Sequence, residues 1–201
     1  MSVSLRPSKK ALSIARTLHV YVSMALLLLM LFFAFTGITL NHPDWFGASN
    51  ASSHTESLAL PDFLLPIAAD DQDWQEAAAH WMASQWQGQR QQIEVSVDEL
   101  VLVQKGPGRY RTILLDTEMA EVQVESLDYG LVAVLNDLHK GRNSGGIWSL
   151  VIDASAILML LFSLTGAFLL LPQSRRLKRS LGYMGGVTAA CVAIYWLSIP
   201  G

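Results

Sequence analysis

The 201 residues are 51% hydrophobic and only 15% charged, whereas about a quarter of the residues in an ordinary soluble domain are charged. Much of the chain is therefore expected to lie in a lipid bilayer. The formal net charge of -3 argues against a nucleic-acid-binding protein. A single cysteine, Cys191, excludes an internal disulfide, and without CxxC or CxxCH motifs the sequence has no signature of a zinc knuckle, a thiol-ligated iron–sulfur cluster or covalently attached haem.

Three apolar segments are long enough to cross the hydrocarbon core as helices. We expect transmembrane helices at residues 17–41, 147–171 and 181–199. A basic start and an apolar core also suit a cleaved signal peptide, but the first apolar run is long and no clear A-x-A site follows it, so we expect an uncleaved anchor. In the third segment, small residues that allow close helix packing offer an oligomer interface; they are Gly182, Gly186 and Ala190.

Basic and acidic residues are concentrated in different segments of the chain. Residues 1–16, which include Arg6, and the loop 172–180 each carry four basic residues and no acid, so the positive-inside rule places both in the cytoplasm. Residues 42–146 hold nearly all of the acids and are expected on the periplasmic side. This pattern predicts a multi-pass protein of a bacterial inner membrane, with its N-terminus cytoplasmic and its C-terminus periplasmic.

The segment 42–146 is predicted to be a small α+β domain inserted between the first two transmembrane helices. A loop rich in Ser, Asn and Ala comes first, a helix follows, and alternating apolar residues then indicate strands. Near the end, apolar residues at helical spacing indicate a short amphipathic helix that stops at Gly141. The expected elements are a helix at 70–87, strands at 92–97, 101–103, 109–115 and 120–124, and a helix at 131–138.

Three of the five histidines, His19, His42 and His139, fall at membrane boundaries, where an imidazole is a functional candidate. Neutral histidine is the usual axial ligand of b-type haem. His42 and His139 are expected at the same depth on consecutive spans and form the natural ligand pair. His19 would need a second, inner site, because it lies about 35 Å from His42 along one helix. The alternative is that all three are interfacial hydrogen-bonding groups. His54, in the polar loop, and His80, in the soluble helix, are assigned to structure or solvent.

Other polar groups near the predicted transmembrane helices have two or more possible roles. Arg142 follows His139 closely and is expected to meet either a haem propionate or a lipid headgroup. Asp153, the one carboxylate inside a span, lies on a small polar helical face and is expected to turn toward the bundle interior. Its carboxylate would then accept a hydrogen bond from a neighbouring helix or from a ligating histidine, or it would relay a proton. The alternative is a purely structural role. Thr36-Gly37 and Thr165-Gly166 suggest either a weak inverted repeat or tight helix packing.

No nucleophile–base pair, phosphate-binding glycine loop or nucleotide fingerprint is present, so we expect no autonomous hydrolase or kinase. Several motifs together resemble the PepSY-associated transmembrane family over nearly the whole chain, and residues 70–126 resemble a PepSY module. The motifs are Leu18-His19-Val20-Tyr21, Thr36-Gly37, Asn41-His42-Pro43-Asp44-Trp45, Asp137-Leu138-His139-Lys140-Gly141-Arg142 and Leu164-Thr165-Gly166.

Larger members of that family include inner-membrane reductases of siderophore-bound iron, in which histidines hold b-type haem and pass electrons across the membrane. The resemblance implies haem b and electron transfer at the periplasmic side of a reductase system, with a redox partner protein, because this chain has no recognisable flavin or NAD(P)H domain. The alternative is a membrane-anchored periplasmic binding or regulatory module, without a redox cofactor, that recognises a periplasmic protein, a protease or a metal ion.

Overall fold

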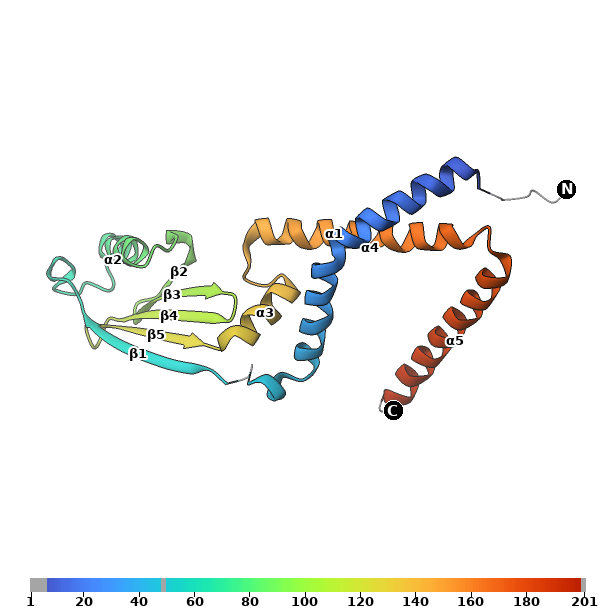
Figure 1. The fold of residues 1–201 in the computed structure, drawn as a ribbon. Helices are drawn as coiled ribbons and strands as arrows, with labels where there is room; N and C mark the ends of the chain where they lie inside the picture. The colour runs from blue at the N-terminus through green and yellow to red at the C-terminus, as the bar shows by residue number, and fades with distance from the viewer. Residues whose placement is uncertain (1–6, 48–49, 200–201) are drawn as a thin grey trace. The chain divides into compact units, whose positions relative to one another are not determined.

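The computed structural model describes residues 7–47 and 50–199, so the predicted cytoplasmic Arg6 lies outside the described residues. The chain divides into two units, one formed by Met1–Leu31 with Ile152–Gly201 and the other by Phe32–Val151. Three helices are long and apolar enough to cross a membrane: α1 (Lys9–Asn41), α4 (Gly145–Leu170) and α5 (Ser174–Ser198). A five-stranded antiparallel sheet lies between α1 and α4 in the chain (Figure 1). The predicted fold class is therefore confirmed.

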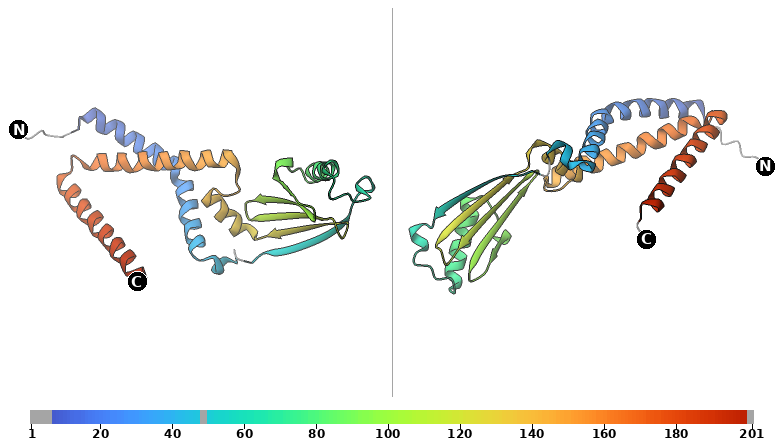
Figure 2. Two further views of the ribbon diagram at one scale, coloured as in Figure 1. Left: turned by 180° about the vertical axis from the view of Figure 1, so that it is seen from behind. Right: turned by 90° about the horizontal axis from the view of Figure 1, so that it is seen from below.

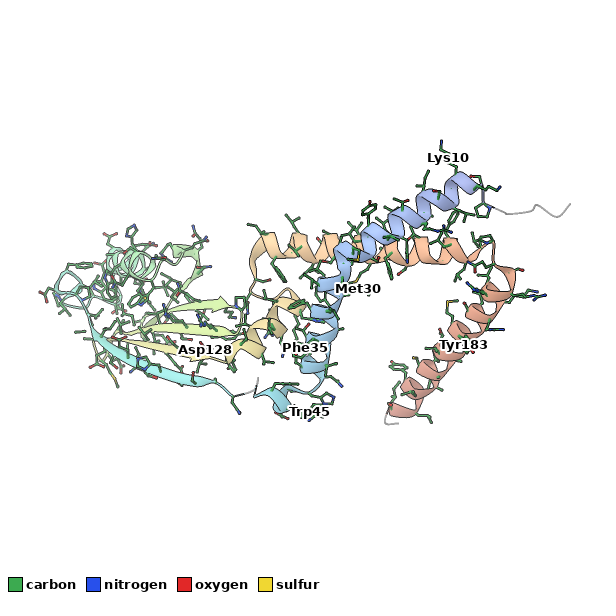
Figure 3. All side chains as sticks on the ribbon, viewed as in Figure 1. Lys10, Met30, Phe35, Trp45, Asp128 and Tyr183 are labelled. Carbon is green, nitrogen blue, oxygen red and sulfur yellow. The ribbon has the colours of Figure 1, made fainter. Side chains whose placement is uncertain are left out.

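Two helices extend beyond the apolar segments that predict them. Helix α1 begins at Lys9 rather than at residue 17, and α5 begins at Ser174, so most of the predicted loop 172–180 is helical. The hydropathy pattern stops where Lys and Arg begin, but both are good helix formers and the helices continue through them. No described residue of α5 is buried; its side chains, including Tyr183, are drawn in Figure 3.

The sheet has the strand order β1-β5-β4-β3-β2, with every neighbouring pair antiparallel (Figure 2). Two tight hairpins, β3–β4 and β4–β5, form its centre, as the alternating sequence pattern predicts. The Pro107-Gly108 turn joins the first pair, with Gly108 in the left-handed region at φ 64°. The strands are β1 (Ser52–Ala59), β2 (Ile93–Val95), β3 (Glu99–Gly106), β4 (Arg109–Asp116) and β5 (Glu121–Asp128).

Strand β1 corrects the prediction of a loop before Pro61. It pairs with β5 along its full length, from Ser52 opposite Asp128 to Ala59 opposite Glu121. It is an edge strand and nearly all of its residues are exposed. Backbone hydrogen bonds hold such a strand without a buried face, so its sequence shows no alternation of apolar and polar residues. His54 therefore lies in a strand and not in a polar loop.

One helix, α2 (Gln72–Gln85), covers one face of the sheet and supplies one side of the core (Figure 1). Asp71 precedes the helix, and its carboxylate accepts a hydrogen bond from the backbone N–H of Asp73 at 2.9 Å and so caps the first turn. Residues facing inward from both layers are almost completely removed from solvent. They include Trp74, Ala78, Ala79 and Met82 of α2, and Leu100, Leu102, Ile113, Leu115 and Val122 of the sheet.

The amphipathic helix predicted after the sheet is α3 (Gly130–Lys140), and it ends at Gly141 with φ 66°, as expected. It packs closely on the β3–β4 turn. The backbone N–H of Gly108 donates to Asp137 Oδ2 at 2.9 Å, and Asp137 is 5% exposed. A Cβ atom at Gly108 would lie 2.7 Å from the backbone nitrogen of Val134. The turn and α3 therefore hold each other through contacts that only glycine permits.

Candidate functional site

His139, in the last turn of α3, is held against the C-terminal part of α1. Its Nδ1 lies 2.6 Å from the hydroxyl oxygen of Thr36, and its ring meets the Phe33 ring edge to face at a centroid distance of 5.2 Å. Gly37 lies beside the imidazole, and a Cβ there would meet His139 Cε1 at 3.8 Å, an ordinary van der Waals contact. The Thr-Gly pair of α1 thus forms the surface against which this imidazole is positioned.

The hydrogen bonds of Thr36 determine which nitrogen of His139 carries the proton. The Thr36 hydroxyl lies 2.6 Å from the carbonyl oxygen of Phe32, which can only accept, so the single hydroxyl proton is used there. Toward His139 the hydroxyl oxygen must therefore accept, and Nδ1 is the donor. In a neutral imidazole this leaves Nε2 with an unshared electron pair. Among the described residues Nε2 has no hydrogen-bond partner.

His19 repeats this arrangement within the other unit. Its Nδ1 lies 3.0 Å from the hydroxyl oxygen of Thr165 and 3.2 Å from the carbonyl oxygen of Phe162. Both contacts require Nδ1 to donate, because a carbonyl only accepts and the Thr165 proton is used on Leu161 O at 2.7 Å. The ring stacks on Phe162 at 4.6 Å. A Cβ at Gly166 would lie 3.2 Å from His19 Cε1.

The two Thr-Gly pairs therefore do the same work at two histidines. Each threonine hydroxyl accepts an imidazole N–H, and each glycine lies beside the ring, with a tight approach only at Gly166. The sequence contained a signal for this in the repeated Thr-Gly of spans one and two. It could not assign a histidine to each pair, because His139 and Thr36 are more than a hundred positions apart. The arrangement orients two imidazoles with Nε2 available as a ligand atom.

The structure does not bring His42 into contact with His139. His42 lies at the start of the short helix η1 (Pro43–Phe46), where its ring stacks on Trp45 at a centroid distance of 3.8 Å (Trp45 is labelled in Figure 3). Its Nε2 is 3.5 Å from the side-chain nitrogen of Asn41. The Pro43 that follows His42 ends α1, which is the structural role that its position suggests.

Arg142 is tied to α3 by an ion pair, with its guanidinium 3.1 Å from Asp137 Oδ1. The pair lies at one side of a depression of about 390 Å³ between α3, the β3–β4 turn and the end of α1, lined also by Tyr110 and Lys140. His139 does not line this depression. The predicted contact of Arg142 with a propionate or a headgroup therefore remains a prediction.

Asp153 is exposed on α4 and has no hydrogen bond or ion pair among the described residues. The other members of its predicted polar face, Ser149 and Ser163, are also exposed and donate to carbonyls of their own helix. The buried residue of α4 is instead Ser155. Within its unit Asp153 does not contact His19, and its predicted turn toward a bundle interior stays a prediction. Within residues 7–47 and 50–199, no three His, Cys, Asp or Glu side chains form a metal-binding group.

A model of the PepSY_TM-like family matches residues 13–200, which include all three long helices and the sheet domain. The chain belongs to the PepSY_TM-like family. Comparison with curated proteins and with solved structures finds no match. Family membership agrees with the resemblance found in the motifs and establishes a PepSY_TM-like membrane protein, with both imidazole sites inside the matched region.

Proposed function

We propose that this PepSY_TM-like protein binds b-type haem and carries electrons at the periplasmic side of a bacterial inner membrane, as a subunit of a reductase system that acts on iron. His139 and His19 are the ligands that this proposal favours. Its main support is the pair of matched histidine–threonine hydrogen bonds, which fix Nδ1 as the donor and leave Nε2 free.

This arrangement fits the chemistry of an axial ligand. A metal-bound histidine commonly donates its second ring N–H to a fixed acceptor, which sets the tautomer and the ring orientation. Thr36 and Thr165 would serve as those acceptors. When bound, haem supplies a one-electron redox couple, and the residues of this chain supply orientation and apolar surroundings.

We infer that a second chain completes each site. Neither His19 nor His139 lines five of the best-defined depressions on the described residues, and His42 is engaged by Trp45. In addition, none of the three long helices is more than 11% buried over its most apolar window. The remaining ligand and the enclosing wall would come from a second copy or from a redox partner protein.

The first test is a reduced-minus-oxidised visible spectrum, with haem extraction, of the full-length protein purified in mild detergent from haem-supplied cells. We expect a stoichiometric b-type signal. His139→Ala should lose haem while remaining in the membrane fraction, and His19→Ala should lose a separate part of the signal. His80→Ala is the matched control, because His80 is exposed on α2 and should leave the spectrum unchanged.

The threonines give a sharper test of the tautomer argument. Thr36→Val keeps the shape of the side chain but removes the acceptor, and loss of such a partner typically lowers metal affinity roughly 10- to 100-fold. Thr36→Ser keeps the hydroxyl and should bind haem like the native chain. A colourless native protein from replete cells would instead favour a membrane-anchored binding or regulatory module, and haem retained in the His19 and His139 double variant would refute the ligand assignment.

A further inference from the structure

The sheet face that α2 covers has a second half that α2 leaves open. Strand register places the side chains of this half in two cross-strand rows beyond the apolar core. The first row is Gln104, Arg111, Ser126 and His54, and the second is Gly106, Arg109, Asp128 and Ser52. Neighbours within such a row have Cβ atoms about 4.5–5.5 Å apart, so each row presents its polar groups together.

These rows form most of the lining of a depression of about 420 Å³, which Lys105 also lines. Arg109 is engaged by Asp128, with 3.0 Å between Nε and Oδ2. Arg111 donates only its Nε, to the Ser126 hydroxyl at 3.3 Å. Among the described residues, neither Arg111 nor Lys105 has a carboxylate within ion-pair distance. The side chain of Lys105 points to the opposite face of the sheet from Gln104 and Gly106, so the depression contains one positive charge without a partner, on Arg111, together with the unused N–H groups of its guanidinium.

We propose that this depression binds the oxyanion group of a small solute, a carboxylate or a phosphate, with Arg111 as the principal contact. A guanidinium presents parallel N–H groups that match two oxygens of such a group. Arg109 adds a second guanidinium, which is paired with Asp128. The site is separate from the imidazole sites and does not depend on haem.

The charge distribution of the domain makes this depression distinctive. Residues 42–146 contain only six basic residues, and three of them, Lys105, Arg109 and Arg111, line the one depression. The acids of the domain outnumber its bases, so its long-range field repels anions. A local site with an unpaired guanidinium would overcome that repulsion at short range and would select ligands that reach into the depression.

Isothermal titration of the full-length protein in detergent, at low ionic strength, tests the proposal with citrate as the carboxylate probe and pyrophosphate as the phosphate probe. At least one probe should bind saturably, and the probe that binds identifies the class of oxyanion. Arg111→Gln should weaken that binding roughly 10- to 100-fold, as expected for loss of a charge-assisted hydrogen bond. Lys105→Gln should leave binding unchanged, because the Lys105 side chain lies on the opposite face of the sheet.

Arg90→Gln is the matched control. It removes the same charge from the same domain, but Arg90 pairs with Glu76 at 2.8 Å and does not line the depression. We expect this variant to bind like the native protein. The proposal is overturned if neither probe binds saturably, if Arg111→Gln binds like the native chain, or if Arg90→Gln weakens binding as much as Arg111→Gln does.

Discussion

The contact between the β3–β4 turn and α3 predicts a large effect for Gly108→Ala. Gly108 has φ 64°, and a non-glycine residue in this left-handed region costs about 1–2 kcal/mol. The added Cβ would also lie 2.7 Å from the backbone nitrogen of Val134, which cannot move without displacing α3. Overpacking of this kind typically costs about 1–3 kcal/mol more. The expected total loss in unfolding free energy is about 2–5 kcal/mol.

Gly130→Ala separates the two contributions. Gly130 has φ 79°, but a Cβ there would meet no atom within 4 Å, so this variant carries the backbone cost without the clash. Urea unfolding of the full-length protein in mild detergent, followed by tryptophan fluorescence, measures both variants. Gly108→Ala should be less stable than Gly130→Ala by about 1–3 kcal/mol. Equal losses in the two variants would show that α3 does not pack on the turn as described.

Three further predictions use the same unfolding assay. Met82→Ala, at a fully buried position, should lower the unfolding free energy by about 2–5 kcal/mol. Met119→Ala, at a position 67% exposed, should lower it little. Similar losses in the two variants would contradict the core assignment. Asp137→Ala should lower the unfolding free energy by about 1–3 kcal/mol, because it leaves the buried backbone N–H of Gly108 unpaired. Asp137→Asn should lower it less. The N–H of Gly130 holds the pKa of Asp128 below its ordinary 3.8. Ionised Asp128 therefore stabilises the fold above about pH 4 and loses this effect as the pH falls further, so Asp128→Asn should flatten the stability profile there; an unchanged profile would refute this.

The sequence predicted those elements whose formation depends on the pattern of neighbouring residues. Hydropathy located the three long helices, alternation located β3, β4 and β5, and the position of Gly141 located the end of α3. Strand β1 was not predictable in this way, because an exposed edge strand is held by backbone pairing and places no constraint on which of its side chains are apolar. The predicted first residues of α1 and α5 were wrong, because charged residues interrupt an apolar run but do not interrupt a helix.

The candidate site was predictable in its parts but not in its pairing. The sequence identified His19 and His139 from their positions near the membrane boundaries, and it identified the Thr-Gly repeat separately. Only the structure assigns Thr165 to His19 and Thr36 to His139, because each pair joins residues from two helices. The sequence favoured His42 as the partner of His139 from depth alone, but depth does not determine which side of a helix a residue occupies.

The pairing of β1 with β5 also determines how the sheet domain is inserted into the chain. Ser52, where β1 begins, is the cross-strand neighbour of Asp128, where β5 ends. The chain thus enters and leaves the domain about 5 Å apart, the spacing of neighbouring strands. Domains with adjacent ends can be inserted, exchanged or removed with little strain on the surrounding structure. A short linker could therefore join the two ends if residues 52–128 were removed, and the contact of α3 with the β3–β4 turn is what such a deletion would sacrifice.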